Sequence, residues 1–106
     1  MESTGDMKAL FIIVNAGFAE DVIQVAREAG IKGATILNVR GEGAHHESFM
    51  GITVDTEKEM ILSITDEGTA GSAMTAVKEK AGINTPAHSV CFTMPVEKVV
   101  GLRMEN

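Results

Sequence analysis

Four short runs of apolar residues, rich in β-branched side chains, occur along the chain, and each predicts a β-strand. They cover residues 8–14, 34–40, 59–65 and 90–94. The first run, Lys8-Ala-Leu-Phe-Ile-Ile-Val14, is apolar at nearly every position, which is typical of a central strand that is buried on both faces.

Two segments between these runs have apolar residues at the spacing of an amphipathic helix. In the first they are Phe18, Val22, Val25, Ala26 and Ala29, and in the second they are Ala70, Met74, Val77 and Ala81. Gly30 followed by Ile31 predicts a Schellman-type end for the first helix. We expect Asp66 or Thr69 to cap the start of the second helix and Gly82 to end it.

The order of these elements predicts an α+β fold. The segments Val25–Ile31 and Val77–Ile83 match at their Val, Ala, Gly and Ile positions, and each closes a helix before a strand. The chain therefore indicates two βαβ units, which make a ferredoxin-like βαββαβ sandwich. Right-handed crossovers place both helices on one face of a four-stranded antiparallel sheet, with a long loop after the second strand. We expect residues 8–106 to form this one domain and residues 1–7 to form a disordered tail.

The other face of this sheet has no cover within a single chain. We expect it to carry Ile61, Cys91 and one side of the first strand. A half-apolar open face predicts burial against another copy of the chain, and hence an oligomer. The alternative is a monomer whose sheet face is solvated.

Three methionines, Met60, Met74 and Met94, are expected to pack in the core. Pro95 is expected to start a short turn of helix that runs through Val99.

Composition narrows the classes of function. The 106 residues have a net charge of −6, and the four aromatic residues are all phenylalanine. An acidic surface repels phosphate backbones and few rings are available for stacking, so nucleic acid is not an expected partner.

The single cysteine excludes a disulfide within one chain and fits a reducing cytosol. Neither a signal peptide nor a membrane-spanning run is recognisable, so we expect a cytoplasmic protein without direct membrane insertion.

We expect the functional residues to lie in a long loop, residues 41–57, because loops of this length in small domains are usually functional or disordered. It contains His45 and His46, while His88 precedes the last strand. These histidines are either solvated loop residues or, together with Glu47, ligands of a metal ion such as zinc. Adjacent histidines point to opposite faces of an extended chain, and no recognised ligand spacing is present.

Gly41 and Gly43 either allow the backbone to approach an anion closely or serve as a hinge at the base of the loop. The full three-glycine dinucleotide motif is absent. Cys91 lies in the middle of a strand, where a small packing residue is expected, and no paired carboxylates occur in an apolar setting. The sequence therefore favours a non-catalytic protein over an enzyme.

Three segments resemble those of a known protein family. They are Ala29–Gly43, His46–Gly51 with the following Val54-Asp55, and Val90–Val100. Over about residues 8–103 the chain resembles the PII signalling proteins, the nitrogen-regulatory trimers. The resemblance implies a homotrimer with a protruding T-loop, ATP or ADP in clefts between subunits, and often 2-oxoglutarate beside them. It also implies that the loop docks on membrane ammonium channels or metabolic enzymes.

The chain departs from this family at charged positions. Residues 44–46, Ala-His-His, replace an Arg-Gln-Lys-type stretch, and Val90 stands where a phosphate-binding lysine is usual. Of two arginines that reach the phosphates, Arg103 remains and Gly101 replaces the other. No tyrosine is present, so the loop cannot be uridylylated, and Phe49 lies near that position. Each lost charge-assisted bond weakens phosphate binding by about 1.5–3 kcal/mol, so two or three losses weaken ATP binding by orders of magnitude.

We therefore interpret the chain as a divergent PII-like regulator that senses a small effector at clefts between subunits, with ADP, AMP, ATP or another small anion as candidates. The expected ligand-binding residues are Thr35, Gly41, Gly43, His45, His46, His88 and Arg103. The expected partner-docking residues in loop 41–57 are Glu47, Phe49 and Met50, and the expected partner is a membrane transporter or a metabolic enzyme. The alternative function is a metal-binding trimer that uses His45, His46, Glu47 and His88.

Overall fold

The computed structural model describes residues 2–3, 6–40, 48–49, 52–53 and 57–102. The main elements are β2 (Met7–Asn15), α1 (Ala19–Glu28), β3 (Thr35–Arg40), β6 (Glu57–Asp66), α2 (Glu67–Ala81) and β7 (Val90–Pro95). Four two-residue strands complete the set: β1 (Glu2–Ser3), β4 (Ser48–Phe49), β5 (Ile52–Thr53) and β8 (Lys98–Val99).

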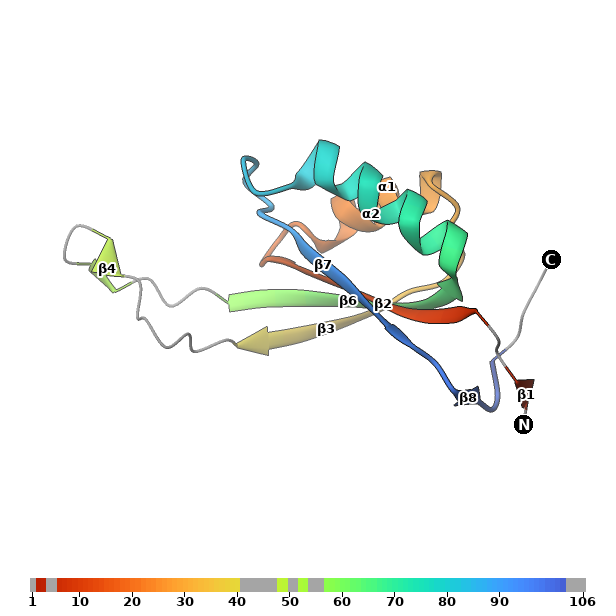
Figure 1. Ribbon diagram of the computed structural model, residues 1–106. Helices are drawn as coiled ribbons and strands as arrows, with labels where there is room; N and C mark the ends of the chain where they lie inside the picture. The colour runs from red at the N-terminus through yellow and green to blue at the C-terminus, as the bar shows by residue number, and fades with distance from the viewer. Residues whose placement is uncertain (1, 4–5, 41–47, 50–51, 54–56, 103–106) are drawn as a thin grey trace.

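The four long strands form one antiparallel sheet in the order β3-β6-β2-β7. Both helices lie on the same face of this sheet, and no described helix or strand covers the opposite face (Figure 1). The predicted α+β, ferredoxin-like βαββαβ fold is confirmed. β4 and β5 pair with each other, away from the four-stranded sheet.

The core lies between the helices and the two central strands. Alternate residues of β2 point toward the helices, and Leu10, Ile12 and Val14 are almost fully buried there. They pack with Ile61 of β6 and with residues of α1 and α2, among them Val22, Ala26, Ala73 and Val77. The small residues of α2 allow that helix to lie close to the sheet and to α1.

The two ends of α1 are stabilised in different ways. At its C-terminus, the Gly30 N–H donates to the Arg27 carbonyl at 3.0 Å and the Ile31 N–H donates to the Ala26 carbonyl at 3.1 Å. These bonds and the φ of +117° at Gly30 are those of the predicted Schellman motif. At its N-terminus no side chain of α1 caps the helix.

The N-terminal cap of α2 also confirms a prediction. The Asp66 carboxylate accepts hydrogen bonds from the Thr69 N–H and the Thr69 hydroxyl, both at 2.8 Å. These bonds favour the ionised carboxylate and hold the pKa of Asp66 below its usual value.

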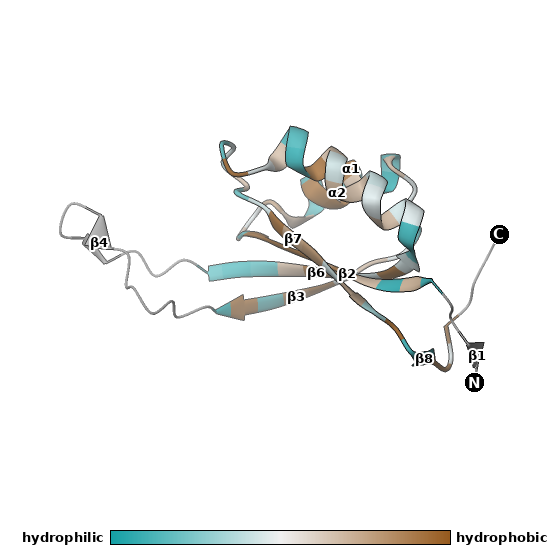
Figure 2. Ribbon diagram, viewed as in Figure 1, coloured by the Kyte–Doolittle hydropathy of each residue, from teal (hydrophilic) through white to brown (hydrophobic). Residues whose placement is uncertain are grey.

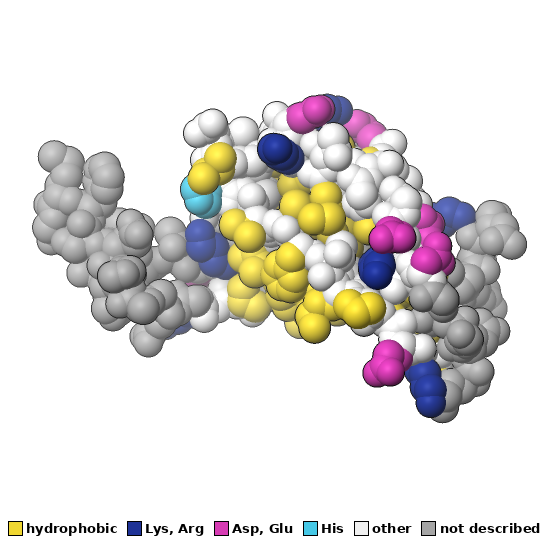
Figure 3. Space-filling model, viewed as in Figure 1, with side chains coloured by type: hydrophobic (Ala, Val, Ile, Leu, Met, Phe, Trp, Pro, Cys, Tyr) yellow, Lys and Arg dark blue, Asp and Glu magenta, His cyan; other side chains and the backbone are white. Residues whose placement is uncertain are grey.

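The open face of the sheet differs from the prediction in its residues. Directly opposite residues on neighbouring antiparallel strands share a face. By that rule the polar Asn15, Thr35 and Lys58 lie on the open face. Its apolar residues are Ala9, Phe11, Ile13, Leu37, Val39, Met60, Leu62, Ile64, Val90, Phe92 and Met94. Figure 3 shows hydrophobic side chains gathered on this side of the molecule, below the helices. We call this set the open apolar face.

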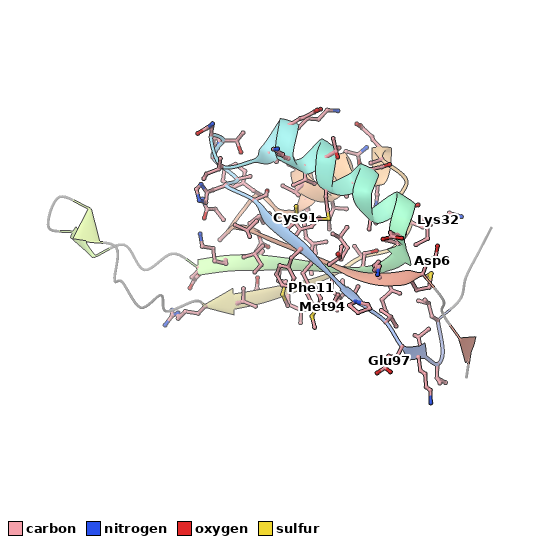
Figure 4. The ribbon with its side chains drawn as sticks, viewed as in Figure 1. Asp6, Phe11, Lys32, Cys91, Met94 and Glu97 are labelled. Atoms are coloured by element: carbon pink, nitrogen blue, oxygen red, sulfur yellow. The ribbon has the colours of Figure 1, made fainter. Side chains whose placement is uncertain are left out.

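The predicted placement of Ile61 and Cys91 on the open face was wrong. Ile61 is buried in the core, and Cys91 packs against that core from the helix side of β7, whereas Phe11 and Met94 point to the opposite side (Figure 4). A shift of one residue in the assumed alternation moves every side chain of a strand to the other face.

For the same reason, the predicted core positions of Met60 and Met94 were wrong, since both lie on the open apolar face. The predicted packing of Met74 against the core is confirmed.

The chain termini and the end of β7 also differ in detail from the prediction. The expected helical turn from Pro95 through Val99 is absent, because Lys98–Val99 forms β8 and pairs with β1. Within the predicted tail, residues 1–7, Glu2–Ser3 forms β1 and Met7 begins β2. Among the described residues, no helix is long and apolar enough to cross a membrane.

The fold generates a prediction at two glycines, Gly71 within α2 and Gly82 at its C-terminal cap. A Cβ at Gly82 would lie 2.4 Å from the Lys78 carbonyl oxygen, so Gly82→Ala forces a backbone shift. A Cβ at Gly71, inside the helix, would meet nothing within 4 Å. We expect Gly82→Ala to lower the free energy of unfolding in urea by about 1–3 kcal/mol. Gly71→Ala should raise it by about 0.5–1 kcal/mol, because alanine loses less backbone entropy in a helix. Equal effects of the two substitutions would contradict this close packing.

Candidate ligand site at the loop end of the sheet

Polar residues gather at one end of the sheet, where β3 stops and β6 starts. The antiparallel register pairs Arg40 with Glu57 and Asn15 with Lys58, so the end of β2 lies there too. The start of β7 at Val90 pairs with Ile13 and reaches the same end. Figure 2 shows the hydrophilic residues of β6 at this end, in contrast with the apolar centre of the sheet. We call it the loop end, because the segment of residues 41–56 joins β3 to β6 here.

Asn15 connects the sheet to the loop of residues 82–89. Its backbone N–H donates to the Ala87 carbonyl and its side-chain Nδ2 donates to the Pro86 carbonyl, both at 2.9 Å. The Lys58 ammonium donates to Asn15 Oδ1 at 2.5 Å. Three segments that are distant in sequence therefore meet at one amide side chain.

Lys58 lies at the rim of the open apolar face. It pairs with Asn15 on one side and with Val39 on the other, and it shares their face of the sheet. Its cation is therefore on the side of the sheet that the helices leave uncovered. An anion bound to Lys58 would lie at the border between the open apolar face and the loop of residues 82–89.

Glu59, the next residue, points to the helix side and has a structural role. Its Oε1 accepts a hydrogen bond from the Gly17 N–H at 2.7 Å and a longer one, at 3.4 Å, from the Ala19 N–H. A carboxylate at a helix N-terminus satisfies unpaired N–H groups and opposes the helix dipole. Glu59 thus replaces the side-chain cap that α1 lacks.

Arg40 and Glu57 form an ion pair at the base of the segment of residues 41–56. The Arg40 Nη2 to Glu57 Oε1 distance is 3.5 Å, and both side chains are more than 70% exposed, at 73% and 72%. Exposed pairs of this kind contribute at most about 1 kcal/mol, and salt screens them. The pair is therefore weak enough to rearrange when another anion or cation approaches.

His88 is the predicted site residue that the structure places at this end. It has a left-handed backbone, with a φ of +47°, and its Nδ1 lies 2.9 Å from the Ile83 carbonyl oxygen. A carbonyl only accepts, so Nδ1 carries the proton and Nε2 is left for another partner. The side chain is exposed, and the hydrogen bond fixes the direction of its ring.

Thr35, a second predicted site residue, lies at the other end of β3. It opposes Leu62 in β6, five residues from the Arg40–Glu57 end. At about 3.3 Å per residue this places Thr35 about 17 Å from the loop end. The structure therefore does not bring Thr35 and His88 together within one chain.

The other predicted residues cannot be placed. Outside the described residues lie Gly41, Gly43, His45, His46, Glu47, Met50 and Arg103. Phe49 forms part of β4, and only its backbone is described. Within the predicted loop 41–57, Glu57 belongs to β6.

Sequence reasoning missed Lys58 and Asn15. The hydropathy pattern puts Lys58 at the polar end of the loop and Asn15 in the break after the first strand, so neither stands out as a site residue. The sequence feature that could have identified them is their position, since Asn15 directly follows the apolar run of β2 and Lys58 directly precedes that of β6.

Metal and nucleophilic chemistry find no support at the described positions. In the part of the chain that the structure describes, no three His, Cys, Asp or Glu residues are grouped as metal ligands would be. Three of the four predicted metal ligands lie outside that part. Burial raises the pKa of the Cys91 thiol, which disfavours the reactive thiolate.

Comparisons with known structures agree with the fold. A PII-like signalling protein from Thermus thermophilus is 17% identical, with a TM-score of 0.63 and coverage of 83% of this chain and 84% of that one. CPII, a nitrogen regulatory PII-like protein from Thiomonas intermedia K12 whose structure holds ADP, AMP and bicarbonate, is 21% identical. Its TM-score is 0.65, and the match covers 91% of this chain and 96% of that one. A search of curated protein sequences finds no match.

The comparison with family models assigns the chain directly. The model described as nitrogen regulatory protein P-II matches residues 7–106, nearly the whole sequence. The chain therefore belongs to the P-II family, whose members are regulatory proteins and not enzymes.

Proposed function

We propose that this protein is a homotrimeric sensor that binds an adenine nucleotide, or another small anion, at clefts between its subunits. It regulates a partner protein through residues 41–57. The observation that supports this most directly is that Lys58, held by Asn15, and His88 both lie at the loop end. They supply a cation and an oriented imidazole at the edge of a surface suited to self-association.

The open apolar face supports the oligomer. Phe11 and Phe92 stack on it with ring centroids 4.8 Å apart, and Phe92, Met94 and Leu37 are each 40% or more exposed. A continuous apolar surface over all four strands favours burial against other copies. Because Lys58 lies at the rim of this face, a ligand bound to Lys58 would also face the neighbouring copy.

The charges of the site favour a ligand with few phosphates. Val90 stands where the family's lysine is usual and Gly101 where an arginine is usual, so two cations are missing. The relative from Thiomonas intermedia is described with ADP, AMP and bicarbonate. We propose AMP and ADP as the nucleotides that bind well, bicarbonate as a candidate second anion, and ATP as a weaker ligand. In the assembled trimer, Thr35 of one subunit and His88 of the next would both belong to the cleft, together with Gly41, Gly43 and Arg103.

Membership of the P-II family supports regulation of a partner protein. Glu47, Phe49 and Met50 are proposed to dock on a membrane transporter or a metabolic enzyme in the cytoplasm, in nitrogen regulation or in membrane transport. The metal-binding alternative, with His45, His46, Glu47 and His88, has no supporting observation among the described residues. It is tested below as one outcome of the ligand-binding experiment.

The first prediction concerns the oligomer. Phe92 on the open apolar face and Ile36 on the helix side of β3 have nearly equal exposure, 40% and 41%. Phe92→Glu places a charge in the proposed interface, and we expect light scattering to show monomers or a strongly weakened trimer. Ile36→Glu is the matched control and should leave the assembly intact. A wild-type monomer, or equal effects of both substitutions, would contradict this interface.

The second prediction concerns the ligand. AMP and ADP should raise the melting temperature of the wild-type protein more than ATP at equal concentration. Lys58→Gln should weaken AMP binding by about tenfold to a hundredfold in isothermal titration, because a charge-assisted bond is lost. The control is Lys80→Gln, which changes the net charge equally but removes only an exposed pair with Glu28 on the helix layer.

Three results would count against the nucleotide site. One is the absence of stabilisation by any adenine nucleotide. Another is an equal loss of AMP affinity in Lys58→Gln and Lys80→Gln. The third is stabilisation by zinc alone, which would favour the metal-binding alternative.

A further inference from the structure

We propose that Asn15 is a positioning residue that relays ligand occupancy between the loop of residues 82–89 and the start of β6, where the segment of residues 41–56 rejoins the sheet. This proposal rests on the proposed function, because it takes Lys58 as the group that meets the anionic ligand. It assigns a role to a residue that does not itself touch the ligand.

Every hydrogen-bonding group of Asn15 is engaged. Its N–H and Nδ2 donate to the Ala87 and Pro86 carbonyls, and its Oδ1 accepts from Lys58. Its own carbonyl accepts from the Phe18 N–H at 3.2 Å, in the turn that leads into α1. One residue thus holds the loop of residues 82–89, the start of β6 and the entry to α1 in fixed relation.

The start of β6 is bound to the same turn at three successive residues. The Glu57 carbonyl accepts from the Ala16 N–H at 3.1 Å, Lys58 donates to Asn15, and Glu59 accepts from Gly17. The hydrogen bonds of residues 15–17 therefore offer a path by which a displacement of the loop of residues 82–89 can reach the start of β6. Within the described contacts, Asn15 is the member of that turn that bonds to both sides.

The amide is chemically suited to this position because it donates and accepts at once. The Pro86 carbonyl requires a donor and the Lys58 ammonium requires an acceptor. An aspartate would repel the carbonyl, and an aliphatic residue would bind neither group. When an anion draws the ammonium away, Asn15 Oδ1 loses its hydrogen-bond partner. The Asn15 side chain is then held only by its bond to the Pro86 carbonyl.

The Asn15 amide and the anion compete for the Lys58 ammonium. In the ligand-free state Lys58 is held by Asn15, and in the bound state it is held by the anion, so the two states differ in a defined contact. Removal of the Asn15 amide should free the lysine for the anion. Asn15→Leu should therefore bind AMP at least as tightly as the wild type. In this variant, however, AMP binding should no longer change the hydrogen bonds of the turn at residues 15–17. A residue with a merely structural role would instead lose affinity when replaced.

The test uses hydrogen exchange of the Ala16 amide, measured by NMR on the full-length protein. Its ligand-free arm perturbs the loop of residues 82–89 with Thr85→Ala, which removes the 2.8 Å bond from the Thr85 hydroxyl to the Gly82 carbonyl. We expect Thr85→Ala to accelerate Ala16 exchange about fivefold in the wild-type background. In the Asn15→Leu background the same substitution should have no added effect, as a double-mutant cycle would show.

The ligand arm repeats the measurement with AMP, and Asn38→Leu on the exposed strand β3 is the matched control. AMP should change Ala16 exchange in the wild type and in Asn38→Leu, but not in Asn15→Leu. Additive effects of Thr85→Ala and Asn15→Leu, or an unchanged AMP response in Asn15→Leu, would overturn the relay and leave the nucleotide site standing. A coupled cycle in a protein that does not bind AMP would support the relay and refute the proposed ligand.

Discussion

The structure depends on one constraint: β2 is apolar on both faces, but in the described part of the chain both helices lie on one side of the sheet. Leu10, Ile12 and Val14 find their cover beneath α1 and α2. Phe11 and Ile13, which alternate with them, face the side of the sheet that neither helix covers. Burial of such side chains contributes about 1.5–3 kcal/mol each, so burial of this face against another copy would be favourable. The proposed ligand site at the rim of the face would then lie beside the neighbouring copy.

Most of the fold could be predicted from the sequence because it depends on local signals. The glycine after α1, the aspartate before α2 and the apolar periodicities each act over a few residues, and the structure confirms them at Gly30 and Asp66. The alternation of β6 and β7 could not be assigned in the same way. On the helix side of β6, Ile61 alternates with the polar Glu59 and Ser63, whereas the open side is apolar at Met60, Leu62 and Ile64. Hydropathy alone therefore favours the wrong side for the core, and the register with β2 is needed to place Ile61.

The candidate site was predictable only in part, for a physical reason. His88 was noticed because histidine is a chemically distinctive side chain, and the structure places it at the loop end. Lys58 and Asn15 became relevant only when the antiparallel pairing placed them opposite each other and beside the loop of residues 82–89. Contacts between residues more than forty positions apart leave no trace in local spacing, and a lysine at the edge of a polar loop resembles any solvated lysine.

The pleat of β6 explains how a cation is kept available in an acidic protein. Glu57, Lys58 and Glu59 are consecutive, and without the strand the two carboxylates would screen the ammonium. In the strand, the register places both glutamates on the helix side, where Glu57 pairs with Arg40 and Glu59 caps α1. Lys58 alone of the three points to the opposite side, where its recorded partner is the neutral Asn15 amide. The neighbours of Lys58 across the sheet on that side, Asn15 and Val39, are uncharged, so no carboxylate of these two partners neutralises its ammonium.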